Sequence, residues 1–259
     1  MSSSLKILLI AFFIIFLKSQ LSSQDNMLDS LNFEPATEPT HTKQYFGIGI
    51  GYTGSFLFSD FKKLNDDIVK KFGLDDLKSP VFLSGIEGFI VTFKIPNLRI
   101  GLSGKGGSAL SEKTMNIAGT DYKRSVEYKL FLSGLSFEYV FMPFNSVAII
   151  PGFGGGIASL SVEAYQGNKK AWTEINETIN ENFLNRAEIS YWYLQPSVSI
   201  EWAVTDYMVL RGNAGYSISL LNTSNWKYNR NAELSGVPPE INSNGLTAQV
   251  GIFFGLFNF

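Results

Sequence analysis

The last stretch of the chain, GLTAQVGIFFGLFNF (residues 245–259), decides the fold because its side chains alternate between two kinds. One face of an extended strand would carry only apolar side chains, and the other would be small or polar apart from Phe253. The apolar set is Leu246, Ala248, Val250, Ile252, Phe254 and Leu256. An open sheet that ended here would expose a long apolar edge, which promotes aggregation. Closing the sheet into a barrel removes the edge, and surrounding lipid explains the uninterrupted apolar face.

Length, composition and charge permit a single β domain and exclude several kinds of site. The chain has 259 residues, a formal net charge of -2 and no cysteine. The absence of cysteine excludes disulfides, thiolate metal sites and a cysteine nucleophile. No basic patch with interleaved aromatic residues is present, so we expect no nucleic-acid partner. We find no spacing typical of a metal or cofactor site.

The N-terminus is typical of a secretory signal peptide. Lys6 precedes the apolar run 8–17, and the small residues Ser22 and Ser23 follow it. A run of about ten residues is too short to span a bilayer as a helix, although an uncleaved anchor is the alternative. We therefore expect a signal peptide at 1–23, a polar periplasmic tether at 24–42 and a barrel at 43–259.

Seven further segments show strand-like alternation, and the connections between strands alternate between long and short. The expected strands are 44–58, 83–95, 98–110, 122–142, 147–162, 186–204, 207–221 and the final stretch from 245. Short periplasmic turns on one side and four longer extracellular loops on the other are typical of an outer-membrane barrel. Residues 59–80 and 165–185 have apolar residues at helical spacing, so we expect a short amphipathic helix in each of these two loops.

Charged side chains test the choice between lipid and water, since a lysine or arginine facing mid-membrane lipid costs about 2–4 kcal/mol. The registers above place one group of charges on the inner face, where it would form an ion-pair network that plugs the lumen. This group is Lys94, Arg99, Lys105, Glu138, Glu201 and Arg211. Glu87, Glu127, Lys129 and Glu188 would point outward near the extracellular ends of their strands, and a bulge could turn Glu87 inward.

Trp192 and Trp202 lie on the outer face of one expected strand, ten residues apart. At about 3.3 Å per residue and a tilt near 40°, their heights differ by roughly 25 Å. That separation matches the apolar band between the two aromatic girdles of an outer-membrane barrel. We therefore expect each tryptophan to mark one membrane interface.

These features together resemble the small eight-stranded bacterial outer-membrane barrels, such as the transmembrane domain of outer-membrane protein A, the OmpX type and the opacity proteins. The final aromatic residues Phe257 and Phe259 resemble the C-terminal signature of that class, although they are one residue out of phase with the even-numbered apolar face. A bulge near Gly255 or an inward turn of the last residues would reconcile the two. The resemblance implies a closed antiparallel up-and-down barrel in the outer membrane, contact with outer-membrane lipid, and insertion by the barrel assembly machinery.

Three functions stay open from the sequence. We favour a non-enzymatic barrel with a structural role or with loops that bind an extracellular ligand; a narrow passive channel is the alternative. A lipid-modifying enzyme is the third, and the enzymes of this kind rely on a histidine at the rim of the barrel. The single histidine, His41, precedes the barrel on the expected periplasmic side, so we expect no catalytic residues and no cofactor.

Overall fold

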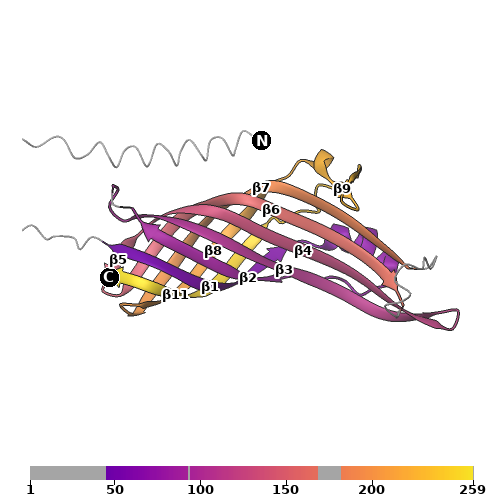
Figure 1. Ribbon diagram of the computed structural model, residues 1–259, viewed down its shortest axis with the longest axis horizontal. Helices are drawn as coiled ribbons and strands as arrows, with labels where there is room; N and C mark the ends of the chain where they lie inside the picture. Colours follow the sequence, from indigo (N-terminus) through magenta and orange to yellow (C-terminus); the bar gives the residue numbers. More distant parts are fainter. Residues whose placement is uncertain (1–44, 93, 169–181, 259) are drawn as a thin grey trace, which may run out of the picture. The chain divides into compact units, whose positions relative to one another are not determined.

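A computed structural model describes residues 45–92, 94–168 and 182–258 of the chain. Eight long antiparallel strands form the wall of a barrel (Figure 1). They are β1 (Phe46–Ser59), β2 (Val81–Val91), β3 (Leu98–Ile117), β4 (Thr120–Tyr139), β6 (Val147–Gly167), β7 (Phe183–Thr205), β8 (Met208–Leu220) and β11 (Gly245–Asn258). A short β5 (Phe141–Phe144) follows β4 and pairs with β6. The signal peptide, the tether with His41, and Phe259 lie outside the described residues.

The sheet is closed. β1 pairs with β11 in an unbroken register from Phe46↔Asn258 to Ser59↔Gly245, and β6 pairs with β7. Every other pair of sequential barrel strands is antiparallel as well. The chain therefore forms the predicted eight-stranded up-and-down barrel, in which no long edge remains in the ring.

The two-residue rhythm of the strands separates an apolar outer wall from the interior. In β11, Leu246 and Val250 are 62% and 65% exposed, whereas Phe253 is fully buried inside. The alternation in the second half of the expected strand 83–95 predicts that Phe89 and Val91 point outward, and this phase of β2 is wrong. Phe82, Ile86 and Ile90 form its outer face, so Glu87, Phe89 and Val91 point inward. The apolar residues in the first half of β2 determine which side chains point outward. The second half of the expected strand indicated the opposite phase.

Three tight turns join the strands at one end of the barrel, which we name the turn end. They are residues 92–97, 145–146 and 206–207. Asn97 and Ser146 have positive φ angles of 61° and 72°, which close these turns. β2 ends at Val91, so the predicted inward lysine, Lys94, lies exposed in the first turn and outside the lumen.

At the opposite end, the loop end, four adjacent strands continue well beyond the others. β3, β4, β6 and β7 have 20, 20, 21 and 23 residues, against 11 to 14 for the remaining four. Residues 111–121, predicted as a loop, are mostly strand, and the hairpin turns at Ala118 and Gly119, both with positive φ. A polar run such as Ser-Glu-Lys-Thr has no apolar face, which is why the sequence suggested a loop. Such a run can still form a strand where the strand lies in water.

The remaining connections carry little regular structure. The expected helix in 59–80 is present as α2 (Lys62–Leu64), η1 (Asn65–Val69) and η2 (Lys70–Phe72), and Gly73 ends it with φ 74°. Residues 221–244 contain the short 3-10 helix η4 (Thr223–Asn225) and a small hairpin of β9 (Lys227–Tyr228) and β10 (Ala232–Glu233). The core of the other expected helix, residues 169–181, lies outside the described residues, and Phe183 begins β7.

No helix among residues 45–92, 94–168 and 182–258 is long and apolar enough to cross a membrane.

Candidate functional site

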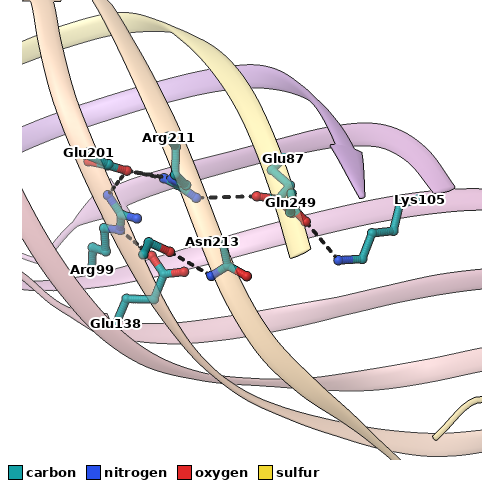
Figure 2. A network of polar contacts seen from close by, with 9 residues as sticks. Glu87, Arg99, Lys105, Glu138, Glu201, Arg211, Asn213 and Gln249 are labelled. Carbon is teal, nitrogen blue, oxygen red and sulfur yellow. Dashed lines mark hydrogen bonds and ion pairs between the residues drawn. The ribbon is translucent and has the colours of Figure 1, made fainter. Parts of the chain in front are cut away.

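The lumen contains a chain of ion pairs that connects five strands (Figure 2). Arg99 of β3 donates through Nε to Glu138 of β4, and its Nη1 lies 2.8 Å from Glu201 Oε1 of β7. The same Glu201 oxygen lies 2.6 Å from Nη2 of Arg211, on β8. Arg211 Nη1 in turn reaches Glu87 Oε2 of β2, at 3.3 Å. The structure thus brings four of the six predicted lumen residues into direct ion pairs and adds Glu87.

Two further residues extend this chain toward the loop end. Gln249 accepts a hydrogen bond from Lys105 Nζ at 3.1 Å and donates one from Nε2 to Glu87 Oε1 at 2.9 Å. Lys105 is only 4% exposed, and none of the described carboxylates lies within ion-pair distance of it. The amide of Gln249 therefore links the ammonium group to the carboxylate that balances its charge.

Aromatic rings contact the two arginines. The guanidinium of Arg99 lies 4.1 Å from the ring centroid of Phe89, and that of Arg211 lies 4.0 Å from the centroid of Phe253. Phe89 also contacts Phe253 and Phe257, with centroids 5.6 Å and 6.0 Å apart. Cation–π contacts of desolvated arginines are worth about 2 kcal/mol each. The sequence did not reveal this cluster because the phase assigned to β2 placed Phe89 outside.

Phe257, expected to belong to an assembly signal, is 6% exposed and points into this cluster. β11 keeps its phase through Asn258 without a bulge, so no shift near Gly255 turns Phe257 outward. Its ring lies over Gly49 of β1, where an added Cβ would come within 2.9 Å of two ring carbons. Glycine at this position therefore leaves room for the ring next to the seam where the barrel closes.

The buried charges balance. Arg99, Arg211 and Lys105 supply three positive charges, and Glu87, Glu138 and Glu201 supply three negative ones. A buried charge without a partner is strongly unfavourable, so this neutrality is what allows the group to stay in the lumen. Replacing one member alone should destabilise the barrel, because it leaves the remaining charges unbalanced.

Apolar side chains close the lumen on both sides of the charged group. At the turn end, Tyr45 is 1% exposed and packs in a cluster with Val91, Val140, Ala148 and Ile150. At the loop end, a larger core fills the space between the long strands and the connections that cover them. Between the charged group and this larger core lies a small polar cavity of about 50 Å³, whose lining includes Ser103, Lys105, Tyr193, Gln195 and Asn213.

The helical segment 62–72 packs over the loop end, and we name residues 61–77 the lid. Phe61, Leu64 and Val69 are buried in the larger core, and the ring of Phe61 lies 5.0 Å from that of Tyr128. Asn65 fastens the lid by accepting a hydrogen bond from Leu77 N at 2.9 Å and donating one to Leu77 O at 3.1 Å. Trp226 and Ile241 of the last connection complete the cover.

The outer wall carries a belt of charges where the long strands leave the apolar zone. Lys129 lies 2.8 Å from Glu163 and 3.1 Å from Glu127, and Arg186 lies 2.8 Å from Glu188. Below this belt, Trp192 and Trp202 are 63% and 54% exposed on the outer face of β7. The side chains of β7 that point outward between the levels of Trp192 and Trp202 are apolar, as expected for a wall that faces lipid.

The described residues contain no group of three or more histidine, aspartate or glutamate side chains placed to hold a metal ion. The only histidine of the sequence, His41, lies outside them.

No protein-family model matches the sequence, and no curated protein matches it. Among solved structures, outer-membrane proteins are similar to this chain. Ail, the attachment invasion locus protein of Yersinia pestis, is 11% identical over 82% of this chain and 99% of its own, with a TM-score of 0.39. A major outer membrane protein from Thermus thermophilus is 10% identical over 81% and 99%, with a TM-score of 0.44. CarO2 of Acinetobacter baumannii is 11% identical over 82% and 99%, with a TM-score of 0.35.

The geometry of the chain itself identifies its class. The eight-stranded antiparallel sheet is closed and its outer wall is apolar. The charged residues of its barrel strands lie either inside the lumen or at and beyond the belt above Trp192. Only helices and closed barrels can span a membrane with every backbone group satisfied. Short turns at one end and long connections at the other are the layout of outer-membrane barrels, so the turn end is periplasmic and the loop end extracellular. The chain is a small eight-stranded β-barrel of the bacterial outer membrane.

Proposed function

We propose that this barrel does not conduct and serves as a membrane anchor for a rigid extracellular binding platform. The observation that supports this most directly is the filled lumen: an apolar cluster around Tyr45, the neutral charged group and the core beneath the lid follow one another along the barrel. An eight-stranded barrel is narrow enough for side chains to fill its interior. A solute that crosses the barrel would have to displace all three of these layers.

We define the platform as the outer parts of the four long strands, residues 108–117, 120–129, 161–167 and 183–188. Its inner face is covered by the lid and by residues 221–244, which give it an apolar core of its own. Tyr128 of the platform donates to Asn242 O at 3.0 Å, and Tyr191, just below it on β7, donates to Ser243 Oγ at 2.6 Å, so the last connection is fixed to these two strands. A prefolded surface binds with a smaller entropy cost than a flexible loop, which favours a binding role.

The partners follow from this placement. The outer wall contacts membrane lipid, and the platform presents its edges and outer face to an extracellular ligand. We also propose that the barrel assembly machinery recognises the last strand, through its outward residues such as Phe254 and Leu256 rather than through Phe257, which points inward.

Planar-bilayer recording tests the proposal. Refolded wild-type protein should produce no conductance steps, and neither should Glu127→Gln, a matched carboxylate change in the outer belt. Steps whose size changes in Glu138→Gln or Arg211→Gln, but not in Glu127→Gln, would show that ions pass the charged group and would overturn the proposal.

A narrow channel is the second candidate, and the polar cavity beside Lys105 favours it. Water in that cavity would need to connect to both sides of the membrane, through the lid and through the Tyr45 cluster. Conductance that appears in a Tyr45→Ala variant and is absent from the wild type would show that the resting barrel is closed, as the anchor function requires.

We further propose that the chain is not an enzyme. The carboxylates Glu87, Glu138 and Glu201 are bound to cationic or amide groups in the lumen, where no lipid substrate would reach them. A lipid-modifying activity that the folded wild type shows and that His41→Ala removes would contradict this proposal.

A further inference from the structure

The lid and the residues at its two ends form a cleft of about 320 Å³ at the loop end of the barrel. One wall is the start of the helical segment, residues 59–65, and the other is the returning chain, residues 76–79. Lys70, near the end of the helical segment, also lines the cleft. Sites for small ligands typically measure about 300–1,000 Å³, so the cleft has room for a ligand at the small end of this range.

The two walls of the cleft are fixed to each other. The side chain of Asn65, on one wall, makes the two hydrogen bonds to the backbone of Leu77, on the other, that are described above. Asn65 and Leu77 are only 6% and 5% exposed, and Phe61 beside them is anchored in the core below the lid. The cleft therefore does not depend on a ligand to hold its walls together, which lowers the entropy cost of binding.

Four exposed charged residues line the cleft, two of each sign: Asp60, Lys62, Lys70 and Asp76. Lys70 is already paired, at 2.7 Å with Asp66 and at 3.7 Å with Asp76. Among the described residues, no group of opposite charge lies within ion-pair distance of the Asp60 carboxylate or the Lys62 ammonium. The cleft thus offers one available charge of each sign, and the four charges sum to zero.

We propose that the cleft binds a small zwitterion with one ammonium and one carboxylate group, such as an amino acid or a dipeptide. The ammonium pairs with Asp60 and the carboxylate with Lys62, so no existing ion pair has to break. A ligand with a net charge would leave one of these two groups without a partner, and complementary charges give specificity. Because exposed ion pairs are weak, we expect low affinity. The inference goes beyond the anchor function and does not depend on the platform or on a closed lumen.

Three matched probes test the charge requirement in full-length protein folded in detergent micelles. They are alanylalanine, its N-acetyl derivative, which lacks the ammonium, and its C-terminal amide, which lacks the carboxylate. Saturation-transfer NMR on the probes should show that alanylalanine binds about threefold to fivefold more tightly than either derivative, the effect of one exposed ion pair. Absence of alanylalanine binding, or equal affinity for all three probes, would overturn the inference.

Two variants assign each end of the ligand. Lys62→Gln should weaken alanylalanine about threefold to fivefold and leave the amide derivative unchanged, because that derivative has no carboxylate to lose. Asp60→Asn should weaken alanylalanine to a similar extent and leave the N-acetyl derivative unchanged. Asparagine keeps the oxygen that accepts a hydrogen bond from Lys62 N, at 2.8 Å in the wild type, so the local fold is retained. A variant that weakens all three probes equally would contradict the assigned contacts.

Lys63→Gln is the matched control. Lys63 follows Lys62 in the chain, but it does not line the cleft and is paired with Asp67 at 3.1 Å. The control should leave the affinity of every probe unchanged. If it weakens alanylalanine as much as Lys62→Gln does, the lysines act only through the overall charge of the lid, and the inference is wrong. None of these outcomes bears on the conductance test, so the anchor function and the cleft fail separately.

Discussion

Arg99 on β3 and Glu201 on β7 are joined across the lumen at 2.8 Å, although β4 and β6 separate their strands in the barrel wall. Both side chains are completely buried. Arg211 binds the same oxygen of Glu201 from β8. One carboxylate thus holds two arginines from different sides of the barrel, so its loss should affect the whole lumen.

We expect Glu201→Ala to destabilise the barrel by about 3–5 kcal/mol, because it leaves two buried guanidinium groups without their shared partner. Urea unfolding in lipid vesicles, followed by tryptophan fluorescence, measures this. Glu127→Gln in the outer belt is the control and should change the unfolding free energy by less than about 1 kcal/mol. A small effect of Glu201→Ala would indicate that water or a rearranged carboxylate replaces Glu201.

Gly51 on β1 should not tolerate a larger side chain, since an added Cβ would lie 2.6 Å from two carbons of the Phe253 ring. We expect Gly51→Val to cost about 1–3 kcal/mol or to prevent barrel closure, as overpacking does in tight interiors. Gly104→Ala is the matched control, because nothing lies within 4 Å of the position of its Cβ. Heat-modifiable mobility in gels reports closure. If Gly51→Val folds as well as Gly104→Ala, the Phe253 ring is not fixed over the seam.

The sequence was sufficient for the closed barrel, the number of strands and the outer face of most strands, because an apolar face that repeats every second residue is incompatible with most folds. It failed in β2, where Phe89 and Val91 suggested an outer face and the earlier residues Phe82 and Ile86 set the opposite phase. That single error excluded Glu87 from the lumen and included Lys94.

Contacts between distant strands could not be read from periodicity. The pairing of Arg99 with Glu201, and the bridge that Gln249 makes between Lys105 and Glu87, depend on which residues face each other across the lumen. The extended platform was missed for a related reason: residues 111–114 are polar on both faces of the strand, and only Met115 and Ile117 are apolar beyond them, so no repeating apolar face marks the segment. Their pairing with β4 makes them a strand.

The lid should respond to acid through Asp66. A hydrogen bond and the charge of Lys70, 2.7 Å away, hold the pKa of the Asp66 carboxyl below its ordinary value. A carboxyl whose folded-state pKa is lowered stabilises the fold above its unfolded pKa, and the contribution is lost as the pH falls through the folded-state pKa. Carboxyl carbon NMR titration should show the low pKa in the wild type and a return toward the ordinary value in Lys70→Met. An unchanged titration in Lys70→Met would remove Lys70 as the cause.

The two exposed tryptophans of β7 should report the membrane boundaries, because amphipathic indole rings prefer the two interfaces. We expect single-tryptophan variants that retain Trp192 or Trp202 to be quenched more by lipids brominated near the head group than by lipids brominated near the chain end. A variant that retains only Trp226, which is 1% exposed inside the extracellular core, should be quenched little by either. Ten residues of tilted strand separate the first two tryptophans by roughly 25 Å in height, so they should also differ in accessibility to a quencher added on one side of the vesicle. Strong quenching of either by chain-end bromine would place the apolar band elsewhere along β7, and the belt around Lys129 would then lie at a different depth.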